Sequence, residues 1–271
     1  MARKVNDVRG MTAVVTGASS GIGLCFTRHL AAMGCRLVMI SNQPDELEKY
    51  ASEIRAEYGS DVLILCLDLT LPDATKRVLA FLESNQLAPD ILINNAGIFS
   101  FRPLTDIPER KLNMFIDLHV RTVTSLTREF GRLMQGRGRG FILNMSSMSC
   151  WMPMPGLSMY AATKAYIRVF TRSVHYEMRD AGVSVMAACP GGIATDLFGL
   201  PPGLMKLALR IHALQTPEKF TEKALRTLFK GKKQYINGWL NRLSIFFVGI
   251  MPTPVRMLVK RRMLDKNIIR P

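Results

Sequence analysis

The sequence has no arrangement of cysteines that indicates a disulfide framework or a metal site. Its five cysteines are odd in number and scattered, no C-x-x-C pair occurs, and the four histidines lack zinc-ligand spacing. We therefore expect reduced, mostly buried thiols, no bound metal and a cytoplasmic protein. A secretory signal is not expected either, because residues 1–10 contain no apolar core.

Acidic residues are scarce relative to basic ones. Lys and Arg number 36 against 21 Asp and Glu, and residues 201–271 hold 15 of the basic but only 3 of the acidic residues. This basic C-terminal part is either a solvated face or a contact for an acidic partner, such as a lipid surface or a phosphorylated cofactor or substrate. A nucleic-acid partner is not expected, because no basic motif interleaved with aromatic residues is present. The glycine–arginine stretch at 136–140 lies between a helix and a strand and is interpreted as a turn.

Short β-rich runs alternate with helix-length segments over most of the chain, whose 271 residues suit one large α/β domain. The alternation predicts a doubly wound parallel sheet of about seven strands with helices on both faces. The near-continuous apolar run at 62–67 predicts a strand buried on both sides. The expected strands are Thr12–Thr16, Arg36–Ile40, Val62–Leu67, Ile91–Asn94, Phe141–Met145 and Val183–Ala188, and the expected helices are 21–33, 44–58, 72–84, 108–134 and 158–181.

A glycine-rich turn, TGASSGIG at 16–23, follows the first expected strand and opens the first expected helix. Its small residues let backbone amides approach a pyrophosphate, and the helix N-terminus adds a favourable dipole. The turn therefore predicts a dinucleotide-binding site. Its candidate residues are Gly17, Ser19, Ser20, Gly21, Ile22 and Gly23.

Further motifs follow this turn in a fixed order. They are Asp68 after the third strand, NNAG at 94–97, Ser147, Tyr160-x-x-x-Lys164, and PG-x-x-x-T at 190–195. With them the sequence resembles the short-chain dehydrogenase/reductase family over residues 12–200. Within that family it is most similar to the 17β-hydroxysteroid dehydrogenase and 3-ketoacyl-CoA reductase branch, which the Pro-x-Pro at 153–155 and the absence of a glycine-rich C-terminal ending support. The resemblance implies a Rossmann-like fold, a nicotinamide cofactor and an oxidoreductase.

Tyr160, Lys164 and Ser147 are the expected catalytic residues. Tyr160 and Lys164 are four residues apart on one expected helix and share a face. A nearby ammonium and a positive nicotinamide ring are expected to lower the tyrosine pKa, so that Tyr160 acts as general acid or base on a ketone/alcohol pair. Ser147, at the end of a strand, is expected to hold the substrate oxygen. A packed helix tyrosine is the alternative for Tyr160.

The resemblance also implies the remaining coenzyme contacts. Lys164 would hold the nicotinamide ribose beside Tyr160, Asp68 with Leu69 would lie at the adenine edge, and Asn94 would form the floor of the cleft. Ala96, Gly97, Pro190 and Gly191 join the contacts, and Ile193 and Thr195 would meet the carboxamide. Simple turn roles are the alternatives for Asp68 and for the Asn94–Asn95 pair.

The end of the second expected strand bears on the choice of coenzyme. It reads Ile40-Ser41-Asn42-Gln43, without the carboxylate typical of NAD enzymes and without the arginine typical of NADP enzymes. Since no carboxylate repels a 2′-phosphate, and Ser20, Ser41 and Asn42 can donate to one, NADP(H) is favoured over NAD(H).

His119 departs from the family pattern. The family places an asparagine 22 residues after the glycine of NNAG, where it orders a water linked to the active-site lysine; this sequence has His119 there. The imidazole either replaces the amide in a proton relay, fills space as a spectator, or marks a weakened or silent active site.

Apolar residues flank the catalytic motif. Trp151, Met152, Met154, Leu157 and Met159 precede Tyr160, and Leu197, Phe198, Leu200, Leu204, Met205 and Leu207 follow Thr195, in a segment that is a substrate lid in this family. They point to an apolar ketone/alcohol pair such as a steroid or long-chain acyl substrate, or they pack a core or a dimer. A catalytically weak nucleotide sensor or scaffold is the alternative function.

The expected organisation is a coenzyme-binding and catalytic core over 1–200, with a lid and basic extension over 201–271 packed on the same domain. The apolar run at 243–251 is too short to span a bilayer. It is either a buried element, an oligomer contact or, with Lys260-Arg261-Arg262, part of an anionic-membrane contact over 240–271 that makes the protein peripherally membrane-associated. The resemblance implies a homodimer or homotetramer through the helices at 108–134 and 158–181.

Overall fold

The strands form one parallel sheet in the order β3-β2-β1-β4-β5-β6-β7. The computed structural model describes residues 7–193 and 215–264. The chain starts at the centre of the sheet, builds outward through β2 and β3, and returns to β4 beside β1 before building the other half. The carboxyl ends of β1 and β4 therefore flank the point where the strand order reverses, which is where open α/β sheets bind ligands.

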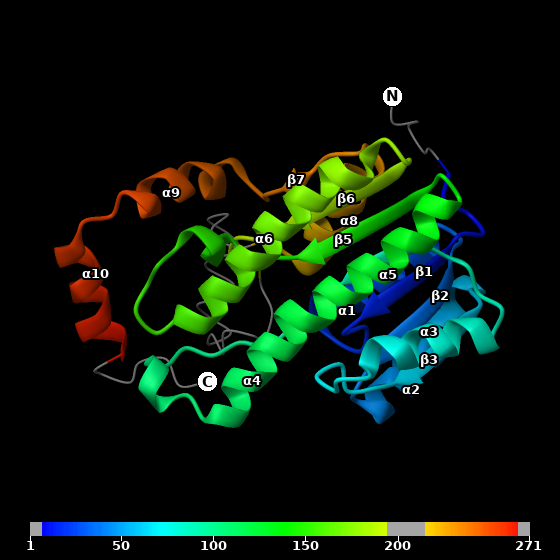
Figure 1. Ribbon diagram of the computed structural model, residues 1–271, viewed down its shortest axis with the longest axis horizontal. Helices are drawn as coiled ribbons and strands as arrows, with labels where there is room; N and C mark the ends of the chain where they lie inside the picture. Colours follow the sequence, from blue (N-terminus) through cyan, green and yellow to red (C-terminus); the bar gives the residue numbers. More distant parts are fainter. Residues whose placement is uncertain (1–6, 194–214, 265–271) are drawn as a thin grey trace.

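Helices cover both faces of this sheet (Figure 1). The strands are β1 (Thr12–Thr16), β2 (Arg36–Ser41), β3 (Val62–Cys66), β4 (Pro89–Asn94), β5 (Gly140–Met145), β6 (Val183–Ala188) and β7 (Gln234–Tyr235). The helices are α1 (Gly21–Ala32), α2 (Pro44–Tyr58), α3 (Ala74–Ser84), α4 (Glu109–Ile116), α5 (Val123–Gly136), α6 (Ser158–Arg179), α8 (Pro217–Phe229), α9 (Trp239–Gly249) and α10 (Thr253–Val259). Shorter helical turns are η1 (Leu104–Asp106), η2 (Asp117–Thr122), η3 (Met148–Trp151) and η5 (Lys260–Leu264).

The architecture confirms the predicted α/β fold class, a Rossmann-like doubly wound parallel sheet. Two expectations were wrong in detail. The apolar run at 62–67 forms an edge strand whose residues 63–65 are only half-buried, because β3 has a neighbour on one side alone. The expected helix at 108–134 is interrupted by the π-helical turn η2, which carries His119.

Alternate residues of the central strand point into two separate cores. Val15 of β1 faces a cluster that contains Phe26 of α1 and Phe220 of α8. Val14 faces a second cluster, which contains Phe130 of α5 and Val174 of α6. Both faces of the sheet are thus buried, as expected for a parallel sheet between two helical layers.

The chain after residue 215 completes the first of these cores. Thr216 caps α8, its hydroxyl accepting the Lys219 N–H at 3.4 Å, and Pro217 occupies the first turn. Phe220 packs edge-on against Phe26 with ring centroids 6.5 Å apart. The expected lid residues, from Leu197 to Leu207, lie outside the described residues, so their role stays a prediction.

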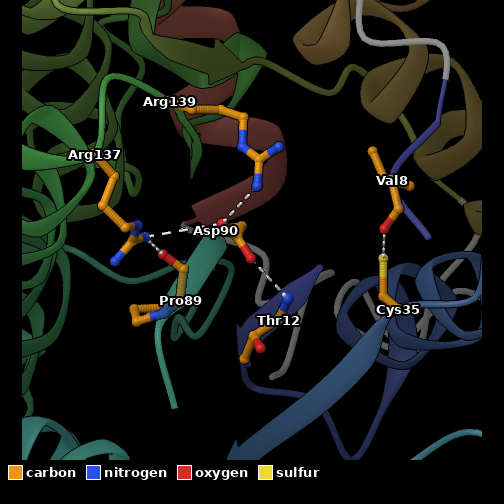
Figure 2. Close-up of polar contacts among 7 residues, drawn as sticks. All are labelled: Val8, Thr12, Cys35, Pro89, Asp90, Arg137 and Arg139. Atoms are coloured by element: carbon orange, nitrogen blue, oxygen red, sulfur yellow. Dashed lines mark hydrogen bonds and ion pairs between the residues drawn. The ribbon is translucent and has the colours of Figure 1, made fainter. Parts of the chain in front are cut away.

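A polar junction fixes the amino-terminal edge of the sheet (Figure 2). Asp90 of β4 accepts the Thr12 N–H of β1 at 3.1 Å and forms an ion pair with Arg139 at 3.5 Å. Arg137 lies 3.9 Å from the same carboxylate and donates to the Pro89 carbonyl oxygen. The glycine–arginine stretch at 136–140 therefore forms the predicted turn, and two of its arginines are engaged with β4.

None of the five cysteines forms a disulfide. Cys35 and Cys189 are buried, and the Cys35 thiol donates to the Val8 carbonyl oxygen (Figure 2). Cys66 is exposed at the sheet edge, so the expectation of mostly buried thiols holds for only part of the set. Among the described residues, His, Cys, Asp and Glu form no group that could hold a metal ion.

Candidate active site

A cavity of about 280 Å³ opens at the carboxyl ends of the central strands. Its walls combine the glycine-rich turn, the loop after β4, the end of β5, one face of α6 and the loop after β6. The lining residues are Gly17, Ser20, Gly21, Ile22, Asn95, Ala96, Gly97, Ile98, Met145, Ser146, Ser147, Tyr160, Lys164, Pro190, Gly191 and Ile193. Most of the predicted catalytic and coenzyme residues are therefore brought to one site.

The glycine-rich turn has no room for a side chain at Gly17 or Gly23. Gly17 adopts φ +64, a left-handed conformation, and a Cβ there would lie 3.0 Å from the Ala96 Cα. A Cβ at Gly23 would lie 1.9 Å from the Gly17 carbonyl oxygen, so the start of α1 can approach the turn only with glycine. Ser20, Gly21 and Ile22 consequently present the N-terminus of α1 to the cavity, a favourable place for an anionic group.

The three expected catalytic residues lie together. Ser147 begins η3, where its hydroxyl oxygen accepts the Ser149 N–H at 3.1 Å, and its side chain also hydrogen-bonds Tyr160. Lys164, one turn beyond Tyr160 on α6, has its Nζ 5.7 Å from the Tyr160 ring centroid and donates to the Met145 carbonyl oxygen at 2.8 Å. That bond anchors the ammonium to the end of β5.

Burial dominates the electrostatics of this group. It raises the pKa of Tyr160 to about 12, and the hydrogen bond from Ser147 offsets only part of the rise. Burial also lowers the pKa of Lys164 to about 8, with the nearby Cys189 thiol acting in the opposite direction. The expected lowering of the tyrosine pKa involves a positive nicotinamide ring as well as Lys164, and it stays a prediction.

His119 is completely buried between the loop after β4 and α6. Its Nε2 accepts the Ile98 N–H at 3.1 Å, so Nδ1 carries the proton and donates to the Thr163 hydroxyl at 3.0 Å. Thr163 in turn donates to the Met159 carbonyl oxygen. Burial, together with the charge of Lys164, holds the pKa of His119 well below its usual value, so the imidazole is neutral.

These contacts occupy both nitrogens of His119. The ring packs edge-on against Tyr160 at 6.1 Å between centroids, and a Cβ at Gly97 would lie 2.9 Å from Nε2 and 3.5 Å from the Lys164 Nζ. His119 thus contacts the residues around the cavity without lining it. A proton relay through His119 stays a prediction. Such a relay requires the hydrogen bond between Nε2 and the Ile98 N–H to break.

The two asparagines of the NNAG motif have different environments. Asn94 is buried below the cavity, where its amide donates to the Asn144 Oδ1 at 2.8 Å and so joins β4 to β5. Asn95 lines the cavity instead and donates to the Thr16 carbonyl oxygen at 3.1 Å. Asn95 was missed as a site residue, although its place in the motif was visible, because sequence spacing does not tell which of two adjacent amides faces the cleft.

The polar residues near the end of β2 form a cluster beside the glycine-rich turn. The Ser19 hydroxyl lies 2.8 Å from the Ser41 hydroxyl and donates to the Gln43 Oε1 at 2.7 Å. Ser41 also accepts the Gln43 N–H at 3.2 Å, and Asn42 is exposed. Gln43 was not among the predicted contacts. It is found here because the first turn of α2 brings its side chain back toward the glycine-rich turn.

The predicted adenine-edge residues lie outside this cavity. Asp68 is exposed, and its Oδ1 accepts the N–H and the hydroxyl of Thr70 at 2.9 and 2.8 Å. It lines a separate cavity with Thr70, Glu109, Arg110, Asn113, Met114 and Asp117. Leu69 is buried, and its carbonyl oxygen accepts the Thr122 hydroxyl. Thr195 lies outside the described residues.

Comparison with known proteins identifies the family. The family model described as short chain dehydrogenase matches residues 11–200. The chain belongs to the short-chain dehydrogenase/reductase family. It is also 31% identical over 254 residues to a very-long-chain 3-oxoacyl-CoA reductase of Anas platyrhynchos, a match that covers 92% of this chain and 78% of that protein. This short-chain dehydrogenase/reductase is therefore an oxidoreductase of the ketoacyl-CoA reductase branch, as the sequence motifs predict.

Solved structures show the same family fold. A 7beta-hydroxysteroid dehydrogenase is 27% identical, with a TM-score of 0.82 and 94% and 97% of the two chains covered. An L-sorbose reductase of Gluconobacter frateurii, solved in complex with NADPH and L-sorbose, is 26% identical with a TM-score of 0.76, over 85% of this chain and 95% of that one. The NADPH-bound neighbour indicates a nicotinamide cofactor for this short-chain dehydrogenase/reductase.

Proposed function

We propose that the protein uses NADPH to reduce a long-chain 3-oxoacyl thioester to the corresponding 3-hydroxyacyl thioester. The observation that carries the proposal is the convergence of Ser147, Tyr160 and Lys164 on a cavity at the sheet's point of strand reversal. The similarity to a protein named very-long-chain 3-oxoacyl-CoA reductase supports the choice of substrate class. Half-buried apolar residues before Tyr160, among them Trp151 and Met154, fit an acyl chain.

A dinucleotide fits the lining of the cavity. The N-terminus of α1 meets it at Gly21, and the glycines at 17 and 97 leave no side chains in the way. Ser20, Gly21 and Ile22 would hold the pyrophosphate, Lys164 the ribose, and Asn95 to Gly97 the floor. When bound, the nicotinamide would supply the hydride.

The chain's own residues then handle the substrate oxygen and the proton. Ser147 would donate a hydrogen bond to the ketone oxygen, and Tyr160 would donate the proton that completes the alcohol. The raised pKa of Tyr160 keeps the phenol protonated at neutral pH, which is the form that reduction requires. Lys164, with its pKa lowered to about 8, would be able to resupply a proton near neutral pH.

A preference for NADPH rests on the end of β2. Ser19, Ser41 and Gln43 form a neutral polar cluster there, and neither Ser41 nor the two residues that follow it carries a carboxylate that would repel a 2′-phosphate. Ser19 and Ser41 lie beside the turn that would hold the pyrophosphate, and donation of their hydroxyls to a 2′-phosphate would replace their bonds to Gln43 and to each other. We therefore expect a lower KM for NADPH than for NADH.

The test follows absorbance at 340 nm with NADPH and NADH in parallel. The substrates are 3-oxoacyl-CoA thioesters of increasing chain length, 3-keto and 17-keto steroids, and small polar ketones. The proposal expects turnover that rises with acyl length and a loss of about 10²- to 10⁴-fold in kcat for Tyr160→Phe, with coenzyme binding retained. Turnover of steroids alone would favour an alcohol dehydrogenase like the steroid enzyme, and coenzyme binding with no turnover would favour the weak sensor or scaffold.

A further inference from the structure

Helix α9 carries most of its large apolar side chains on the side that faces away from the protein. Trp239, Phe246, Phe247 and Ile250 are 71%, 65%, 57% and 63% exposed. With the exposed Leu240 and Leu243 they follow the spacing of a single helical face. Large exposed apolar patches of this kind mark interaction surfaces.

The opposite side of α9 holds the helix to the loops of the active site. Asn241 lies against Gly191, where an added Cβ would be 2.2 Å from its Nδ2. Ser244 donates to the Met148 sulfur at 3.6 Å, one residue after Ser147. Asn237, just before α9, accepts the Gly191 N–H at 2.6 Å. The inward face thus combines the polar Asn241 and Ser244 with the half-buried Ile245 and Val248, whereas the larger aromatic side chains lie on the outward face.

The same arrangement continues through α10. Val255, Met257 and Leu258 are exposed, while Arg256 turns inward and donates to the Pro153 carbonyl oxygen at 3.3 Å. Figure 1 shows α9 and α10 projecting from the end of the molecule opposite α2 and α3. We call the outward apolar residues of these two helices the α9–α10 face: Trp239, Leu240, Leu243, Phe246, Phe247, Ile250, Val255, Met257 and Leu258.

Charge distinguishes between the partners that this face can take. Residues 238–264 contain five Lys or Arg and no Asp or Glu, and Lys260, Arg261 and Arg262 are exposed. A second copy of the chain placed on this face would bring like charges together with no carboxylate from this segment to pair them. An anionic lipid surface offers both an apolar interior for the aromatic side chains and phosphate groups for the cations.

We propose that the α9–α10 face docks this protein on an anionic lipid bilayer. No single helix of the described residues is long and apolar enough to cross a bilayer, and α9 and α10 pass that test only as a pair bent by 106°. Docked through the α9–α10 face, the helices would lie in the interface, with Trp239 at headgroup depth. Since their inner side contacts the loops at Met148, Pro153 and Gly191, docking places the active-site loops next to the membrane.

The test uses the full chain and vesicles of phosphatidylcholine, with or without 30 mol% phosphatidylserine. The proposal expects sedimentation with the anionic vesicles, weakened by raising the salt concentration. Phe246→Glu/Phe247→Glu should lower vesicle binding about 100-fold, since two exposed aromatic side chains are lost from the contact. Ala56→Glu/Ala80→Glu is the matched control, because it adds the same charge at exposed positions of α2 and α3.

Trp239 provides an independent readout, since the protein has only one other tryptophan, Trp151. Brominated phospholipids should quench Trp239, and Trp239→Phe should remove that part of the quenching. Absence of vesicle binding by the wild type, or equal loss in both double variants, overturns the proposal. So does a change from dimer to monomer in Phe246→Glu/Phe247→Glu with vesicle binding unaltered, which would assign the face to a second copy. Turnover of a water-soluble ketone, expected to be equal in both variants, tests the proposed activity separately.

Discussion

Replacing His119 by asparagine should reduce the dependence of folding stability on pH. The imidazole is fully buried and neutral, and its folded-state pKa lies well below the usual value of about 6.5. As pH falls through 6.5 the unfolded chain binds a proton that the folded chain does not, so this contribution to stability is present above 6.5 and is lost below it. Between pH 7.5 and 5.5 the loss is about 1.4 kcal/mol as long as the folded pKa stays below this window.

Urea unfolding at pH 7.5, 6.5 and 5.5 measures this effect. The wild type should lose about 1.4 kcal/mol more than His119→Asn over the two pH units. Thr163→Val is the control, because it removes the acceptor of the Nδ1–H but leaves the buried imidazole in place. A plot of its unfolding free energy against pH should therefore lie below that of the wild type and run parallel to it. Parallel curves for His119→Asn and the wild type would refute the assignment of a neutral buried imidazole.

Two further predictions concern the lysine and the glycine-rich turn. Since burial lowers the pKa of Lys164 to about 8, the unfolded chain holds this proton up to a higher pH than the folded chain does. Between pH 8 and 10 the wild type should therefore gain about 2 kcal/mol of stability relative to Lys164→Met, measured by urea unfolding; equal slopes would contradict the shift. Gly23→Ala should abolish coenzyme binding in a fluorescence titration, because its Cβ would lie 1.9 Å from the Gly17 carbonyl oxygen. Gly136→Ala, at the end of α5, should bind coenzyme normally, because no atom lies within 4 Å of the added Cβ.

The central part of the fold was predictable from local patterns. The limits of β1 and β6 agree with the prediction, because each strand is marked by an apolar run. The burial of β3 was not predictable, because an apolar run of five residues has the same pattern in a central strand and in an edge strand. The two-residue β7 is too short to give a periodic signal, and it forms only by pairing with β6.

The site was predictable to the level of motifs but not of individual contacts. The order and spacing of the motifs located Ser147, Tyr160 and Lys164 beside the glycine-rich turn, where the structure has them. Which of Asn94 and Asn95 faces the cavity depends on the register of β4 against β1 and β5, which the motif does not encode. The direction of the Tyr160 pKa depends on burial, and the sequence contains no measure of how deeply α6 buries that side chain.

The C-terminal helices differ from the rest of the chain in what they add to the folded state. α8 and β7 complete the core around Phe220 and Tyr235, so folding explains their apolar residues. The α9–α10 face contributes no residue to either core, and its aromatic side chains remain in water in the folded chain. Because water-exposed aromatics add little to folding, their apolar surface is free to stabilise a bound state. This separation predicts that Phe246→Glu/Phe247→Glu leaves the melting temperature within about 2 °C of the wild type, and a drop of 10 °C would show that the face packs within the protein instead.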